Sequence, residues 1–145
     1  KENNNSEAFV TDSAEITVDD VRNHAETPAS DFEYIDNGDN VSIKAYNGSD
    51  PIVVIPEQID GKDVISIING PFSNDSLKYV DLGYNLKEFD DAYFSDTLEV
   101  IHLPAGVENL DKVVFFGEDT LTIVGKAGSF AETFAKEEGI KFEAE

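Results

Sequence analysis

FSNDSLKYVDLGYNLKEFDDAYFSDTLEVIHLPAGVENL, residues 72–110, is the stretch that decides the fold, because one order of apolar residues occurs in it twice. Each occurrence has a phenylalanine, a polar turn, a leucine and a short apolar strand. A third begins at Phe116 and Leu121, so that Phe72, Phe94 and Phe116 lie 22 residues apart. Self-similarity at a period of this size indicates a solenoid, in which each unit buries its apolar strip against its neighbours.

Within the two clear units, apolar residues alternate along a short strand. Val80 with Leu82, and Ile101 with Leu103, are expected to face one shared core, because successive side chains on a strand point to opposite faces. The neighbouring positions are then expected to stand side by side on an exposed sheet face; they are Tyr79, Asp81, Val100 and His102. The third strand, near residues 121–124, fits two registers, so no outward position is assigned there.

An opening β-hairpin is predicted at residues 32–46. Its apolar residues alternate with polar ones on both sides of residues 36–40, where the Asn37-Gly38 step suits a tight hairpin turn. A β-branched run at residues 52–55 follows and stops at Pro56. The repeats are therefore expected to begin near residue 52 and to extend to about residue 125.

The last segment, residues 126–145, is expected to cap the repeats. Ser129 and Glu132 have the spacing of a Ser-x-x-Glu capping box at the start of a helix. Phe130 and Phe134 would share the buried face of that helix, and Gly139 would end it. A final strand is predicted at residues 140–142.

Together these motifs resemble the BspA-like leucine-rich repeat family. The resemblance rests on Val-Ile-Pro-Glu-x-Ile-Asp-Gly-Lys-x-Val at residues 54–64, on the leucine units after Phe72 and Phe94, and on the closing helix. It implies a leucine-rich repeat solenoid, mostly β with short helical turns, with an N-terminal β-hairpin and a C-terminal capping helix. The array is short, and Gly83-Tyr84-Asn85 replaces the proline that the family pattern has after Leu82.

The family resemblance also implies a function. Its members are exported bacterial proteins whose repeats are displayed on the cell surface and are associated with adhesion or protein binding, and it implies no enzyme. We expect an extracellular or cell-surface module that recognises a protein or a glycan through the exposed strand face. The candidate ligand-binding residues are Tyr79, Asp81, Tyr84 and His102. The alternative is a structural or oligomerisation module, with no ligand of its own, that pairs edge strands.

Residues 1–31 differ from the repeat domain, residues 32–145. They are expected to form an acidic flexible head with one short helix after Thr17 and a linker at residues 26–30. The net charge of −21 disfavours nucleic acid and anionic membrane surfaces as partners. No apolar run is long enough for a membrane helix. Because the chain starts at Lys1, we expect that a signal segment or a trimmed region preceded it, and a tether there would hold the module at the surface.

The sequence predicts no catalytic residue, cofactor or metal site. The side chains of adjacent acid pairs point in different directions on a strand or a helix, which is the wrong spacing for a glycosidase pair. Neither His24 nor His102 lies in a metal-binding or catalytic sequence motif such as His-x-x-x-His, and the chain has no cysteine. The oxygen-bearing residues 36–40 also suit calcium, but they lack the ligand series of an EF-hand loop, so a hairpin turn is the preferred interpretation.

Overall fold

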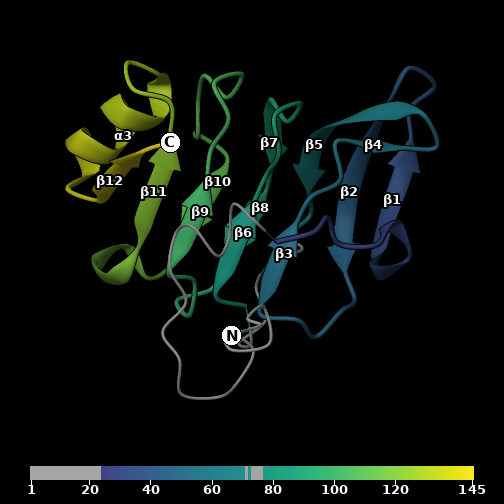
Figure 1. Ribbon diagram of the computed structural model, residues 1–145, viewed down its shortest axis with the longest axis horizontal. Coiled ribbons are helices and arrows are strands. Elements are labelled where there is room, and N and C mark those ends of the chain that lie inside the picture. The colour runs from purple at the N-terminus through teal and green to yellow at the C-terminus, as the bar shows by residue number, and fades with distance from the viewer. Residues whose placement is uncertain (1–23, 71, 73–76) are drawn as a thin grey trace, which may run out of the picture.

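The structure is a computed structural model that describes residues 24–70, 72 and 77–145. Within these ranges the chain is mostly β, with one short α-helix (Figure 1). The predicted helix after Thr17 lies outside the described residues. The elements, in chain order, are η1 (Ala29–Asp31), β1 (Phe32–Asp36), β2 (Asn40–Tyr46), β3 (Ile52–Val54), β4 (Gln58–Ile59), β5 (Lys62–Ile68), β6 (Tyr79–Asp81), β7 (Glu88–Asp90), β8 (Ala92–Phe94), β9 (Val100–His102), β10 (Val113–Phe115), η2 (Glu118–Thr120), β11 (Thr122–Gly125), α3 (Phe130–Glu138) and β12 (Lys141–Ala144).

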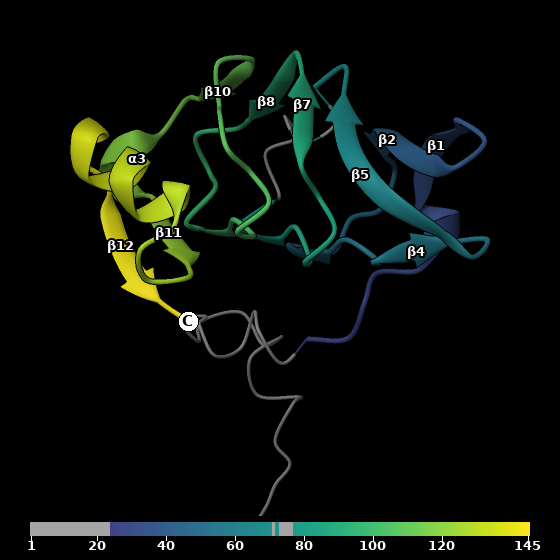
Figure 2. The same cartoon turned by 90° about the horizontal axis from the view of Figure 1, so that it is seen from above.

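The central sheet has the strand order β12-β11-β9-β6-β3 among the described residues, and each of its pairings is parallel. Its register places Val53, Val80, Ile101, Ile123 and Phe142 side by side on successive strands. Figure 1 shows these strands as one row, and Figure 2 shows that the described strands curl, with β1 and β2 at one end and α3 and β12 at the other. The repeated strand units of the sequence are therefore neighbours in space.

The main core lies on one side of this sheet. Val80, Leu82, Ile101 and Leu103 are at most 1% exposed and belong to one apolar cluster. The prediction that these four residues line a single core is confirmed. It holds because each strand alternates its side chains, and in-register parallel pairing puts like positions next to each other.

A second layer of short strands covers the other side of the core. The strands β8 and β10 form a parallel pair, and β7 pairs with β5 (Figure 2). The rings of Phe72 and Phe94 are stacked with centroids 5.5 Å apart and an interplanar angle of 5°. Phe94 continues the stack onto Phe115, at 5.3 Å and 20°.

The third position of the phenylalanine stack corrects the sequence interpretation. Phe116 was expected there, but Phe115 is the residue in register with Phe94. Phe116 directly follows the end of β10, and its side chain lies on the opposite face, against Tyr93, where it is 62% exposed. The last unit is thus one residue shorter than a constant period of 22 would make it.

The opening hairpin is confirmed. The strands β1 and β2 pair antiparallel, and Gly38 in the connecting turn has a φ of +98°, a conformation that favours glycine. The strand β2 then pairs parallel with β5, which joins the hairpin to the repeats. Thr27, in the predicted linker, is 5% exposed and exchanges hydrogen bonds with Val54 of β3. Part of the segment assigned to a linker is therefore anchored to the central sheet.

The closing helix forms as predicted, but its capping box does not. Ser129 is the N-cap residue of α3, and Gly139 ends the helix with a φ of +72°. The Glu132 carboxylate accepts a hydrogen bond from the backbone of Gly128, not from Ser129, and this bond together with Lys136 holds the pKa of Glu132 below its ordinary value. The Ser129 hydroxyl is buried and has no hydrogen-bond partner among the described residues.

The phenylalanine register can be tested by two alanine substitutions. Phe115→Ala should lower the free energy of unfolding by about 1.5–3 kcal/mol, because it removes a ring from the stack. Phe116→Ala should change it by no more than about 0.5 kcal/mol, because that ring is exposed. Urea unfolding of both variants measures the difference. A larger loss for Phe116→Ala would mean that Phe116, and not Phe115, belongs to the stack.

The unpartnered hydroxyl of Ser129 gives a second test. Replacing an N-cap serine by alanine normally costs about 1 kcal/mol. In this chain Ser129→Ala should leave the free energy of unfolding unchanged within about 0.5 kcal/mol, or raise it, because the lost hydroxyl makes no cap bond. Thermal and urea unfolding measure this. A loss of the normal size would show that the hydroxyl does cap the helix in solution.

Candidate functional site

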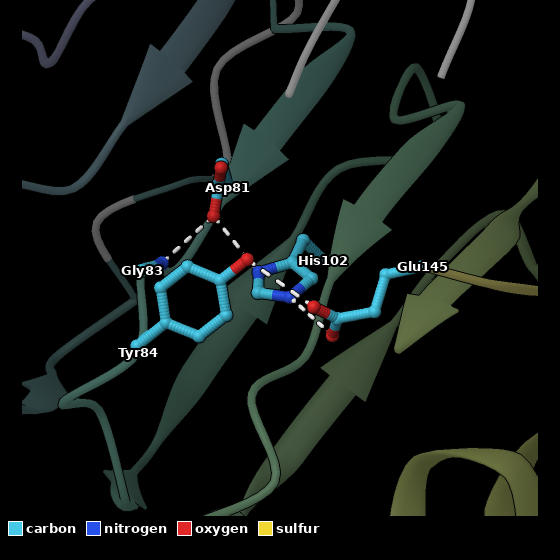
Figure 3. Close-up of polar contacts among 5 residues, drawn as sticks. All are labelled: Asp81, Gly83, Tyr84, His102 and Glu145. Atoms are coloured by element: carbon cyan, nitrogen blue, oxygen red, sulfur yellow. Dashed lines mark hydrogen bonds and ion pairs between the residues drawn. The ribbon is translucent and has the colours of Figure 1, made fainter. Parts of the chain in front are cut away.

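The sequence-predicted site residues Asp81 and His102 come together at the ends of neighbouring strands. Asp81 ends β6 and His102 ends β9, and the two are paired in the parallel register. Oδ1 of Asp81 lies 2.9 Å from Nδ1 of His102 (Figure 3). The expectation that these positions stand side by side is therefore confirmed.

The imidazole of His102 lies between two carboxylates. Its Nε2 is 3.1 Å from Oε2 of Glu145, on the side of the ring away from Asp81 (Figure 3). The His102 side chain is 5% exposed, and burial alone would lower its pKa, but the two carboxylates outweigh burial and raise the pKa above its ordinary value. In the protonated ring both nitrogens donate, so the imidazolium satisfies one oxygen of each acid.

Tyr84 completes the cluster from a loop. Its hydroxyl donates a hydrogen bond to Oε1 of Glu145 at 3.2 Å, and its ring and that of His102 meet at an interplanar angle of 63°, with centroids 5.2 Å apart (Figure 3). The backbone of Gly83 donates to Oδ1 of Asp81 at 2.8 Å, and Gly83 has a φ of +77°. Gly83 thus forms the turn that brings Tyr84 to the histidine.

Glu145 is the member of the cluster that sequence reasoning missed. It lies 43 residues from His102 and follows β12, which is placed by its parallel pairing with β11. Its backbone donates to the carbonyl of Gly125 at 2.8 Å. No local motif signals this contact, because only the position of β12 in the sheet brings Glu145 to the histidine.

The strand face was expected to be exposed, and this expectation is wrong for three of its four residues. Tyr79 is 2% exposed, Val100 6% and His102 4%. The Tyr79 hydroxyl donates to Glu99 at 3.0 Å. A second apolar cluster occupies this face of the sheet and is made of Ile52, Val54, Tyr79, Val100 and Val124. The outward positions carry large apolar side chains, and burial removes these from water.

Asp81, Tyr84, His102 and Glu145 form what we call the histidine cluster, and their polar groups contact one another. Both ring nitrogens of His102 already face carboxylates, so neither is available as a base or a metal ligand. Asp81 and Glu145 lie at opposite ends of the ring and do not converge on one point. Within the described part of the chain, no group of three or more His, Cys, Asp or Glu side chains is arranged to hold a metal ion. In the loop considered for calcium, the Asp36 carboxylate accepts hydrogen bonds from the backbone N–H of Gly38 and from the Lys62 ammonium group.

A different surface exposes apolar side chains. Tyr93 of β8 and Val114 of β10 are neighbours in the parallel register, and Phe116 follows on the same face. They are 39%, 40% and 62% exposed. The rings of Tyr93 and Phe116 are stacked, with centroids 6.3 Å apart and an interplanar angle of 23°. We call Tyr93, Val114 and Phe116 the aromatic surface.

Comparisons with known proteins give one structural likeness. No protein-family model matches the chain, and no curated protein matches it. The structure is similar to a crystal structure of a T. pallidum leucine-rich repeat protein, at 25% identity and a TM-score of 0.41. The similarity covers 72% of this chain and 55% of that one, so the chain spans little more than half of that protein. No helix in the described ranges is both long and apolar enough to cross a membrane.

The histidine cluster makes a prediction about pH. Because the pKa of His102 is raised in the folded chain, its contribution to stability is present in full below about pH 6.5, the ordinary pKa, and is lost as the pH rises through the folded value. His102→Gln should therefore lower the free energy of unfolding by about 1–3 kcal/mol at pH 6 and by less at pH 9.

Urea unfolding of the wild type and His102→Gln at a series of pH values measures this effect. Glu143→Gln is the matched control, since it removes a carboxylate of β12 that faces Lys141 at the surface, and its effect should not depend on pH in this range. An equal loss for His102→Gln at pH 6 and pH 9 would mean that His102 is not charged in the folded protein.

Proposed function

We propose that this chain is an exported bacterial cell-surface binding module, built as a short BspA-like leucine-rich repeat solenoid, that captures a protein or a glycan. The parallel register of β6, β9 and β11 supports the repeat interpretation, because the paired residues Val80, Ile101 and Ile123 recur after 21 and 22 residues. The sequence resemblance supports export and adhesion. Both the family and the location rest on that resemblance.

The observation that carries the binding proposal is the aromatic surface. Five large apolar side chains are exposed among the described residues, and three of them form this surface. Stacked rings give a large contact area at little entropic cost, and aromatic residues are enriched where proteins bind partners. The strand face is a weaker candidate because Tyr79 and His102 are buried, although Tyr84 is 61% exposed there.

Binding of the purified chain to arrays of matrix proteins and glycans tests the proposal. A ligand captured by the wild type should lose at least tenfold in affinity in the double variant Tyr93→Ser, Phe116→Ser, because both rings of the contact are removed. Ile35→Ser is the matched control, since Ile35 is 39% exposed on β1, outside the aromatic surface. Its affinity should equal that of the wild type.

Two further measurements separate the alternatives. Loss of the ligand in Tyr84→Ala, with the double variant unchanged, would place binding on the strand face and overturn the aromatic surface as the binding site. Capture of nothing by the wild type, together with a concentration-dependent mass in sedimentation equilibrium, would favour a structural or oligomerisation module. The melting temperature of each variant shows whether a loss of binding is a loss of fold.

A further inference from the structure

We propose that the aromatic surface takes up a positively charged side chain, so that the partner of this module is a protein with an exposed arginine-bearing segment. This inference rests on the proposed function and narrows its ligand. It follows from three properties of the surface: the rings are held in place, they are bordered by acids, and the whole chain repels a second copy of itself.

Backbone segments pack closely around the two rings, Gly70 against the ring of Tyr93 and Gly117 against the backbone of Asp96. A Cβ atom at Gly70 would collide with the ring of Tyr93, so the absence of a side chain there lets the ring lie over the Gly70 backbone. Beside the other ring, a Cβ at Gly117 would lie 2.7 Å from the Asp96 carbonyl oxygen, which shows how closely the chain after Phe116 packs against the preceding unit. The backbone of Phe116 also donates to Phe94 at 3.2 Å. A surface ordered in this way before binding loses little entropy when a ligand arrives.

Acidic residues flank Tyr93 and Phe116 in the sequence of the two segments that carry the aromatic surface. Segments 90–96 and 111–119 contain six of them against one base, Lys112; the acids are Asp90, Asp91, Asp96, Asp111, Glu118 and Asp119. Lys112 lies 3.5 Å from the Asp90 carboxylate, and both side chains are more than half exposed. The described carboxylates at residues 91, 96, 111 and 119 are also exposed. The local charge therefore favours a cation beside the rings.

Aromatic faces attract cations directly. The face of a tyrosine or phenylalanine ring carries negative electrostatic potential, and a guanidinium group within reach of it is both attracted and able to stack. The surrounding carboxylates strengthen the attraction over a distance of about 10 Å at 0.1 M salt. A second copy of this chain is a poor occupant, because each copy carries a net charge of −21. The occupant that fits both the rings and the acids is an arginine on a basic segment.

The test uses a peptide of alternating glycine and arginine, and the same peptide with citrulline in place of arginine. Citrulline keeps the planar group and removes its charge. Isothermal titration calorimetry at 150 mM salt should show binding of the arginine peptide, and at least threefold weaker binding or none for the citrulline peptide. Phe116→Leu keeps every charge of the protein and should weaken the arginine peptide about two- to fivefold, which is the scale of an exposed cation–π contact.

A stronger ring and a matched control complete the design. Phe116→Trp should bind the arginine peptide more tightly than the wild type, because the indole is the best cation–π partner, and it adds a fluorescent reporter to a chain that has no tryptophan. Ile35→Leu should bind like the wild type. Unchanged affinity in Phe116→Leu would mean that the peptide binds the acidic surface in general, and this would overturn the proposal.

The experiments distinguish failure of the cation proposal from failure of the proposed binding function. If a neutral glycan from the array is captured and is lost in Tyr93→Ser, Phe116→Ser, the module binds through this surface and the cation proposal is wrong. Equal binding of the citrulline and arginine peptides also overturns the cation proposal, and it keeps the aromatic surface as a binding site if Phe116→Leu weakens both peptides. If no array ligand and no peptide loses affinity in Tyr93→Ser, Phe116→Ser, the aromatic surface binds nothing, and both the cation proposal and the proposed binding function of this surface are overturned.

Discussion

The fold depends on contact between equivalent apolar side chains of successive units. A three-residue strand such as β6 or β9 is far shorter than a stable isolated strand, and it becomes stable only when Val80 and Ile101 are buried beside each other. The stack of Phe72, Phe94 and Phe115 does the same for the second layer. Each unit therefore needs its neighbours, and this is why the two ends of the row carry different structures, a hairpin and a helix.

Alternation along the strands also determines which side chains lie on the face of the central sheet opposite the main core. Every strand that sends one side chain to the core sends its neighbours the other way, and there they build an apolar cluster with a charged contact at its end. A buried histidine between two carboxylates is costly to desolvate, so its contribution depends on both acids being in place. The contact joins β6, β9 and the residue after β12, which are distant in sequence. We infer that it aligns the last strand with the sheet.

The sequence predicts turns, strands and helices better than it predicts the burial and the long-range contacts of each residue. The alternation at Val80 and Ile101, the Asn37-Gly38 turn and the closing helix depend on neighbouring residues, and all three are confirmed. The burial of Tyr79 could not be predicted, because one strand does not show how much of its outward face is apolar across the whole sheet. The contact of His102 with Glu145 depends on the placement of β12. Three of the four predicted site residues nevertheless meet. Asp81 and His102 do so because like positions of successive units are adjacent, and the turn at Gly83 adds Tyr84.

The aromatic surface arises from the same one-residue difference that misled the sequence interpretation. With Phe115 in the stack, Phe116 must point outward, because consecutive side chains on a strand face opposite ways. Burial gives no reason for a phenylalanine at a position that is 62% exposed, and a polar residue there would leave the core unchanged. Single exposed apolar residues are common in proteins, but Phe116 stacks on Tyr93 beside Val114, in a chain whose surface is otherwise strongly acidic. Burial does not account for this grouping, and this is the ground on which we propose that the aromatic surface binds a partner.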